Sequence, residues 1–142
     1  MKAAFLLNFA RFVEWADGTA GNTPIAVCVL GEDPFGAALD QALEGESVGT
    51  RRIAARRLRT LEGAGCNVAF VPKSVKDAAR TLAEMPPGVL TVGEGEGFLR
   101  EGGMIALVMD NRRVRFDINM AAVRNSGVRL SSRLLQVARS VK

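Results

Sequence analysis

Apolar side chains near the start of the chain recur with the period of an α-helix. The positions that share one side of a helical wheel are Phe5, Leu6, Phe9, Phe12 and Val13. This spacing predicts an amphipathic helix over residues 2–14, with an aromatic-rich face turned inward. The segment lacks a small-residue cleavage site, so we expect a helix of the mature protein, with any export signal absent from this sequence.

A continuous apolar run at residues 25–30 follows the polar loop at residues 17–23. A run of this kind, closed by Gly31, is typical of a strand buried on both faces. Pro34 then suits the first turn of a helix, and Asp33 suits its N-cap. The expected inner face of this helix carries Phe35, Leu39 and Leu43, before Gly45 ends it.

The middle of the chain alternates again between strand and helix patterns. Residues 51–58 predict a partly exposed strand, and residues 67–71 a buried one. Ser74 is placed to cap a helix that Pro86 and Pro87 would end. Residues 89–92 then predict a short strand that leads into the glycine-rich segment at 93–97, which we interpret as a flexible turn.

The last third predicts an antiparallel hairpin followed by two helices. Its arms are residues 104–109 and 114–118, joined by a turn at 110–113. In the second arm we expect one apolar face (Val114, Phe116, Ile118) and one solvated face (Arg113, Arg115, Asp117). Asn119 can cap a helix that ends near Gly127. Ser131 or Ser132 can cap the final helix, with Leu134, Leu135, Ala138 and Val141 directed inward.

Strands that alternate with helices indicate the α/β class. We expect one compact domain over residues 1–142, with a mixed, mostly parallel sheet, an antiparallel C-terminal hairpin and helices on both faces. A chain of 142 residues is long enough for one well-buried core.

The sequence contains no histidine, which removes the most common general acid/base and metal ligand. Residues 31–36 have the glycine spacing of a phosphate loop but lack its lysine. Gly93, Gly95 and Gly97 do not have dinucleotide-binding spacing, and Glu94 and Glu96 would repel a pyrophosphate. We therefore expect no enzymatic activity, no metal and no cofactor.

The two cysteines, Cys28 and Cys66, are too few for a zinc site and too distant in sequence for a CxxC pair. The residues alone leave two alternatives open, buried reduced thiols or one disulfide.

The net charge of +4 comes largely from two arginine groups, at residues 51–59 and 112–115. They could face an anionic partner or lie on the wet face of strands, and we favour the second interpretation. No aromatic residues interleave with them as in a single-strand binder, so we expect no nucleic acid partner.

Two small sites remain as hypotheses. A ligand crevice could form beyond the carboxyl ends of the parallel strands, lined by Gly31, Asp33, Gly93 and Glu94. Trp15 could anchor a partner, although a core position is favoured.

Several segments, taken in order, resemble the YfiR family, which carries the DUF4154 domain. They are KAAFLLNFARFVEW (2–15), VCVLGEDPFG (27–36), CNVAFV (66–71), VLTVGEGEGF (89–98), GGMIALVMDNRRVRFDIN (102–119) and SSRLL (131–135). The chain departs from the family in having Ala16 where a proline often follows the tryptophan.

The resemblance implies a periplasmic, non-enzymatic regulator with a Cys28–Cys66 disulfide between neighbouring strands. It implies binding to the periplasmic domain of an inner-membrane diguanylate cyclase, which holds the cyclase inactive and lowers cyclic di-GMP. An outer-membrane lipoprotein would relieve the repression, and a homodimer is expected. The alternative is a periplasmic small-ligand sensor that acts on another membrane signalling protein.

Overall fold

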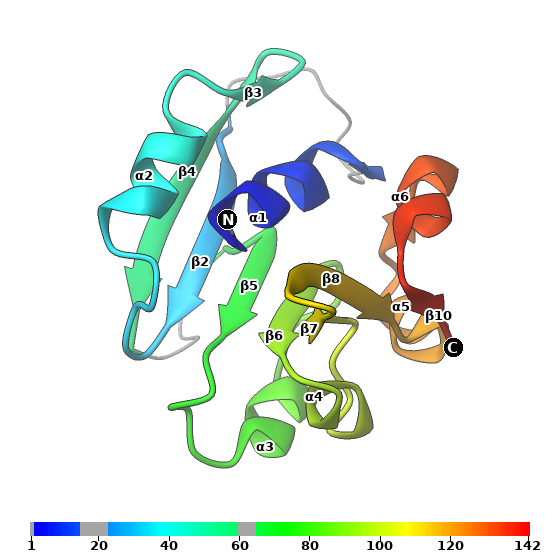
Figure 1. Cartoon of the computed structure of the whole chain (residues 1–142). Helices are drawn as coiled ribbons and strands as arrows, with labels where there is room; N and C mark the ends of the chain where they lie inside the picture. Colours follow the sequence, from blue (N-terminus) through cyan, green and yellow to red (C-terminus); the bar gives the residue numbers. More distant parts are fainter. Residues whose placement is uncertain (1, 15–22, 60–64) are drawn as a thin grey trace.

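The computed structural model describes residues 2–14, 23–59 and 65–142 (Figure 1). The helices in these residues are α1 (Lys2–Arg11), α2 (Ala37–Leu43), α3 (Ala78–Ala83), α4 (Gly97–Arg100), α5 (Met120–Ser126) and α6 (Ser132–Val137). The strands are β1 (Val13–Glu14), β2 (Ile25–Leu30), β3 (Ser47–Val48), β4 (Arg51–Leu58), β5 (Val68–Val71), β6 (Leu90–Glu94), β7 (Ile105–Asp110), β8 (Arg113–Ile118), β9 (Arg129–Leu130) and β10 (Ser140–Val141).

One large sheet has the strand order β10-β8-β7-β6-β5-β2-β4-β3. Its five strands from β4 to β7 run parallel, whereas β8 pairs antiparallel with β7 and β3 pairs antiparallel with β4. Every residue of β2 is buried, because β4 and β5 flank it and helices cover the sheet. The predicted α/β class, mostly parallel sheet and C-terminal hairpin are confirmed.

The sheet has an apolar core on each face. On one face, α1 and α2 pack against side chains such as Val27, Phe70 and Leu107. On the other face, α3 and α4 cover a smaller cluster that includes Leu30 and Val108. Figure 1 shows α1 and α2 beside the upper part of the sheet and α3 with α4 at its lower end. Helices on both faces are therefore confirmed.

The glycine-rich segment at residues 93–97 is not only a turn, because Gly93 makes room for the Phe98 ring. Gly93 belongs to β6 and Gly97 begins α4. A Cβ atom at Gly93 would lie 2.4 Å from the Phe98 ring, and one at Gly103 would lie 2.1 Å from the same ring. The two glycines thus admit the Phe98 ring between them, where it is 4% exposed.

The first predicted helix ends earlier than expected. It stops at Arg11, and Val13 pairs with Leu130 in a small β1–β9 ladder. The carbonyl oxygen of Phe12 accepts a 2.8 Å hydrogen bond from the amide of Ser131. The tertiary contact with the C-terminal region overrides the helical period there.

Two predicted helix starts were also wrong. Helix α2 begins at Ala37, because Asp33 Oδ1 accepts a 2.7 Å hydrogen bond from the Phe35 amide and forms a turn before the helix. Helix α3 is capped by Asp77 rather than Ser74, and Asp77 has a left-handed φ of 55°.

The C-terminal hairpin is confirmed, and so are the N-caps predicted for the two helices that follow it. The turn residues Asn111 and Arg112 have φ values of 52° and 67°, as in a two-residue type I′ turn. Asn119 Oδ1 accepts from the Ala122 amide at 3.2 Å, and Ser131 Oγ accepts from the Arg133 amide at 3.1 Å.

Two expectations in this region were wrong. Asp117, predicted on a solvated face, is 0% exposed because the final segment of the chain covers it. Val141 does not belong to the last helix, which stops after Val137. It lies in β10 with 45% of its surface exposed.

Candidate functional site

Strand β8 forms an incompletely paired edge of the large sheet. It pairs with β7 along its whole length, from Arg113 to Ile118. On its other side, β10 pairs only with Asp117 and Ile118. Within the described residues, no strand covers the segment Arg113–Arg115 on that side.

The backbone of Val114 points outward from this edge. In an antiparallel pair, alternate residues direct their N–H and C=O groups away from the partner strand. Phe116 and Ile118 show this direction, because their carbonyl oxygens accept hydrogen bonds from Arg139 and Lys142, each at 2.8 Å. Val114 has the same parity, so its N–H and C=O face the uncovered side.

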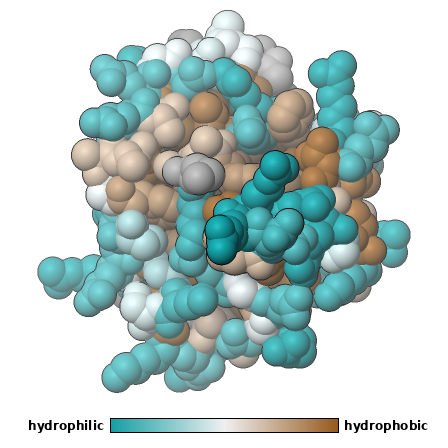
Figure 2. All heavy atoms as spheres, in the orientation of Figure 1, coloured by the Kyte–Doolittle hydropathy of each residue, from teal (hydrophilic) through white to brown (hydrophobic). Residues whose placement is uncertain are grey.

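An apolar hollow of about 290 Å³ lies beside this edge, between α1, β8 and α6. We call it the edge groove. Its lining includes the apolar side chains Phe5, Phe12, Val114, Leu134 and Val137. Val137 is 63% exposed, which is high for a valine beside an apolar surface. Figure 2, drawn in the orientation of Figure 1, shows that hydrophobic residues reach the molecular surface among hydrophilic ones.

Aromatic contacts hold the floor of the edge groove. The Phe116 ring meets the Phe9 ring edge-on with centroids 5.0 Å apart, and it meets the Phe5 ring in the same way at 6.0 Å. Phe9 is fully buried. These contacts fix α1 against β8, so the groove is preformed.

Two arginines of β8 border the edge groove. Arg113 and Arg115 both contribute to its lining and both are exposed. Arg115 forms an ion pair with Asp110, with a nitrogen–oxygen distance of 3.9 Å. Among the ion pairs of the described residues, none includes Arg113. The groove therefore combines an apolar floor with two exposed arginines at its border, of which only Arg115 forms an ion pair within the described residues.

A partly buried ion pair closes the far end of the same edge. Arg139 donates to Asp117 through two nitrogens, at 2.9 and 2.6 Å, and to Glu96 at 2.8 Å. The hydrogen bonds from Arg139 hold the pKa of the Asp117 carboxyl below its ordinary value, against the opposing effect of burial. The pair ties the end of the chain to β8 and fixes where the uncovered edge begins.

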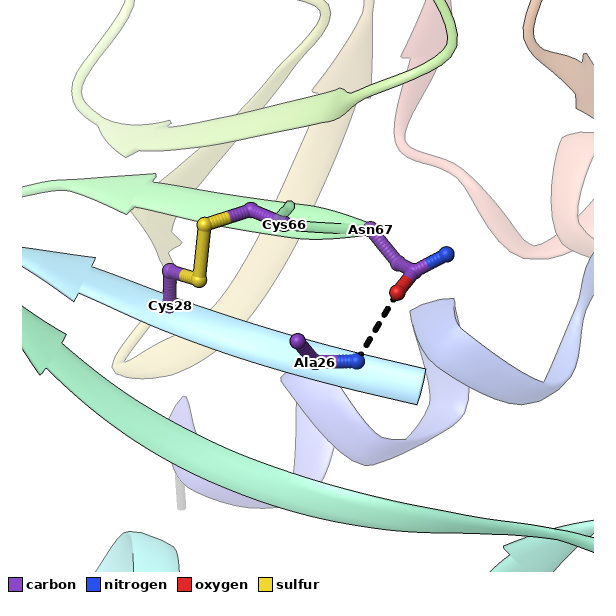
Figure 3. Close-up of a disulfide and its surroundings, with 4 residues drawn as sticks. All are labelled: Ala26, Cys28, Cys66 and Asn67. Carbon is purple, nitrogen blue, oxygen red and sulfur yellow. Dashed lines mark hydrogen bonds between the residues drawn. A yellow bond between two sulfur atoms is a disulfide. The ribbon is translucent and has the colours of Figure 1, made fainter. Parts of the chain in front are cut away.

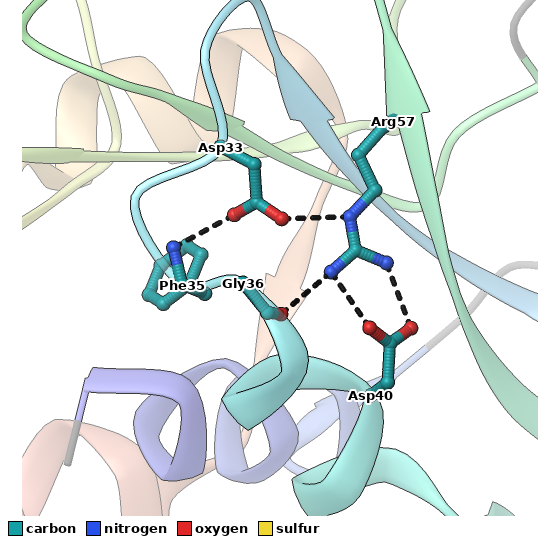
Figure 4. A network of polar contacts seen from close by, with 5 residues as sticks. All are labelled: Asp33, Phe35, Gly36, Asp40 and Arg57. Atoms are coloured by element: carbon teal, nitrogen blue, oxygen red, sulfur yellow. Dashed lines mark hydrogen bonds and ion pairs between the residues drawn. The ribbon is translucent and has the colours of Figure 1, made fainter.

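A second arginine holds two carboxylates on the opposite side of the sheet (Figure 4). Arg57 Nε donates to Asp33 at 2.7 Å, and its two terminal nitrogens donate to Asp40 at 2.7 and 2.9 Å. Burial raises the pKa of the Asp33 carboxyl. Hydrogen bonds from the Phe35 amide and from Arg57 outweigh that effect and lower this pKa overall.

The four residues predicted for a ligand crevice each have a structural partner. The amide of Gly31 donates to the carbonyl oxygen of Leu58, and Asp33 is held by Arg57. Gly93 packs on Phe98, and Glu94 forms a 2.6 Å ion pair with Lys2.

Strand β5 lies between the strands that carry the two pairs of crevice residues. Of the four, only Glu94 lines the hollow of about 230 Å³ at the carboxyl ends of β5 and β6. Ligand binding by this set stays a prediction.

The two cysteines form a disulfide (Figure 3). It joins Cys28 in β2 to Cys66, just before β5, with Cα atoms 6.0 Å apart. Beside it, Asn67 Oδ1 accepts a 2.9 Å hydrogen bond from the Ala26 amide. Both contacts connect β2 with the segment that leads into β5, at the centre of the sheet. Of the two alternatives that the sequence left open, reduced thiols or one disulfide, the structure shows the disulfide.

Trp15 lies outside the described residues. The arginines of β4 do not share one role, since Arg51 is 2% exposed and donates to the Thr23 carbonyl at 2.8 Å, whereas Arg52 is exposed. The wet-face interpretation is therefore wrong for Arg51.

The edge groove suits binding rather than chemistry. Its polar lining residues are Asn8, Arg113 and Arg115, and none of its lining residues carries a carboxylate or a thiol. In the part of the chain that the structure describes, no group of three or more Cys, Asp or Glu residues could hold a metal ion. A larger hollow of about 550 Å³ between α3 and α5 is lined without any charged side chain to orient a ligand.

Sequence reasoning recognised only part of this site. The aromatic face of the first helix was visible in its periodicity, but the exposure of Val137 and the uncovered edge of β8 had no sequence signal. Both depend on where the C-terminal segment crosses the sheet.

The family model DUF4154, described as YfiR/HmsC-like, matches residues 1–139. The resemblance noted in the sequence is thus confirmed over nearly the whole chain. None of the curated proteins matches it.

Proposed function

Because the chain belongs to the YfiR/HmsC-like family, we propose that it represses an inner-membrane diguanylate cyclase by binding the cyclase's periplasmic domain. The family indicates a periplasmic, regulatory and non-catalytic protein of cyclic di-GMP signalling. Among the described helices, none has the length and apolar character needed to cross a membrane.

The observation that carries the proposal is the edge groove, read together with the family. A preformed apolar surface bordered by arginines is suited to hold another protein. The Cys28–Cys66 disulfide supports the periplasmic location, because disulfides persist in oxidising compartments.

Repression follows from differential binding. A regulator that binds the inactive conformation of the cyclase more tightly than the active one shifts the population toward the inactive state. A shift from 1:99 to 99:1 requires a preference of about 10⁴-fold. No catalytic group in the regulator is needed for this effect.

The test is the cyclic di-GMP concentration in the native host with the gene present, deleted and restored as an exported copy. We expect the concentration to rise on deletion and to return with the restored copy. An unchanged concentration would contradict the proposal.

Two further partners belong to the same proposal. An outer-membrane lipoprotein would sequester the regulator and relieve repression, and two copies of the chain would form a homodimer. Sedimentation velocity of the purified protein tests the homodimer, and co-purification from cross-linked envelopes tests the lipoprotein.

A small-ligand sensor acting on another membrane signalling protein is the second candidate. The hollow beside Glu94 favours it, because that hollow lies beyond the carboxyl ends of parallel strands. A periplasmic small-molecule fraction that raises the melting temperature of the wild type, but not of Glu94→Gln, would support it.

A further inference from the structure

The uncovered edge of β8 and the edge groove form one continuous surface. Val114 contributes its outward backbone groups to the edge and its side chain to the groove. We propose that this surface binds an extended segment of a partner protein, which adds as a strand beside Arg113–Arg115 and alternates apolar with acidic residues. The inference rests on the proposed function and names the kind of segment that the partner presents.

The backbone argues for a strand rather than a helix as the occupant. A helix satisfies its own backbone groups, whereas an extended segment can pair with the N–H and C=O of Val114. Strand β10 already extends this edge from Asp117 onward. An added segment would continue the same sheet where β10 ends.

Because β8 has one apolar face and one face with arginines, a strand paired with it should alternate apolar and acidic residues. Val114 and Phe116 pack toward the α1 side, so the neighbouring Arg113 and Arg115 project from the other face. An added strand would place one set of side chains against Phe5, Phe12 and Val137 in the groove. Its other set would lie beside the two arginines, where carboxylates are favoured.

The positive charges of Arg113 and Arg115 argue against a second copy of this chain as the partner at the β8 edge. Antiparallel pairing of two β8 strands would bring Arg113 and Arg115 of both copies together. Like charges across a strand pair are destabilising. An acidic partner segment removes that repulsion and neutralises the arginines.

The probe is an acetylated and amidated peptide that alternates valine and glutamate over about seven residues, the length of a typical strand. Its binding to the whole chain is measured by isothermal titration calorimetry. The amide shifts of Arg113 and Val114 in a nitrogen-15 spectrum report where it binds. Two matched peptides replace glutamate with lysine or carry an N-methyl group at the central residue.

We expect the glutamate peptide to bind at least about tenfold more tightly than either matched peptide, as expected for one lost charge-assisted or backbone hydrogen bond. Val114→Pro should weaken binding by a similar factor, because proline at an edge removes only an outward N–H. The paired change Arg113→Glu with Arg115→Glu should do the same. Its control, Arg52→Glu with Arg59→Glu, changes the charge equally within and just after the distant strand β4 and should alter binding less than about twofold.

Several results would overturn the inference. One is equal binding of the N-methylated peptide, and another is equal binding of the lysine peptide. Undiminished peptide binding by the Arg113→Glu, Arg115→Glu protein would also overturn the inference, and this result does not depend on whether Val114→Pro folds. A wild-type dimer that Val114→Pro or the Arg113→Glu, Arg115→Glu protein converts to a monomer would assign the edge to a second copy instead.

Measuring the cyclic di-GMP concentration in cells that export each variant distinguishes this inference from the proposed function. Exported Arg113→Glu, Arg115→Glu protein should repress less than the exported control with Arg52→Glu and Arg59→Glu. If both repress as well as the wild type, the strand-addition inference fails and the proposed function stands. If the wild type itself does not repress, the proposed function fails, whereas the peptide measurements still decide the edge.

Discussion

Arg57 and Arg139 perform the same local task in different surroundings. Each guanidinium holds two carboxylates, Asp33 and Asp40 in one case and Asp117 and Glu96 in the other. The Asp40 side chain is 56% exposed, whereas the Asp117 side chain is 0% exposed. The difference teaches that geometry alone does not set the importance of an ion pair, because water substitutes for a lost partner only where it has access.

The two clusters also connect different parts of the chain. Arg57 joins β4 to the turn before α2 and to α2 itself. Arg139 joins the end of the chain to β8 and to the segment before α4. The second cluster therefore controls the edge that we propose as the binding surface.

Arg139→Met should have the largest effect on stability. It leaves the Asp117 carboxylate, which is 0% exposed, without its counter-ion, and removing one partner of a buried carboxylate lowers the free energy of unfolding. Urea unfolding at pH 7 measures the change. Arg133→Met, at an exposed position of α6, is the control, and a loss no larger than that of the control would contradict the prediction.

Replacing both partners should restore most of that loss. Asp117→Leu combined with Arg139→Met removes the charge and the group that compensated it, so the free energy of unfolding should lie closer to that of the wild type than to that of Arg139→Met. The same urea series measures it. A double variant as unstable as Arg139→Met would show that the carboxylate is not the source of the penalty.

The acid sensitivity of the protein should depend on the buried pair. Arg139 lowers the pKa of Asp117 below its ordinary value of 3.8 in the folded state. The unfolded chain therefore takes up this proton at higher pH than the folded chain does. The contribution is fully present above the ordinary value and is lost as the pH falls through the folded pKa.

Between pH 6 and pH 3 the wild type should consequently lose more stability than the Asp117→Leu, Arg139→Met double variant. Urea midpoints at the two pH values give the comparison. Equal losses in both proteins would assign the acid sensitivity to other carboxylates, such as Asp33 and Asp40.

Arg57→Ala should have the smallest effect. Its loss exposes carboxylates that water can reach, so the free energy of unfolding should fall by no more than about 1 kcal/mol. Thermal and urea unfolding beside the control Arg52→Ala measure it. A loss equal to that of Arg139→Met would remove the distinction between the two clusters.

The sequence was most informative where the structure is local. The helix caps at Asn119 and Ser131 were correct, because a cap depends on residues a few positions apart. The buried strand at residues 25–30 was correct because its apolar run has no polar face. The caps assigned to Asp33 and Ser74 failed, since Arg57 and the Phe35 amide engage Asp33 and Asp77 caps α3 instead.

The candidate site, in contrast, depends on contacts between distant segments and was predicted only in part. The aromatic face of the first helix could be predicted, but not that Phe5 and Phe9 would meet Phe116 from the hairpin. The alternation of β8 indicated which side chains share a face, yet it placed Asp117 in solvent. No pattern in the sequence shows that Arg139 will cover that position from 22 residues away.

By itself, the amino-acid sequence determined the α/β class, the hairpin and the absence of histidine chemistry, because these depend on composition and short-range periodicity. It also indicated the family, through the order of the motifs that resemble it. Only the tertiary structure decided that the C-terminal segment covers Asp117 and Ile118 but leaves Arg113–Arg115 uncovered. Period-two alternation assigns side chains to two faces of a strand. Which face is buried, and which edge stays open, depends on contacts between segments that the pattern does not connect.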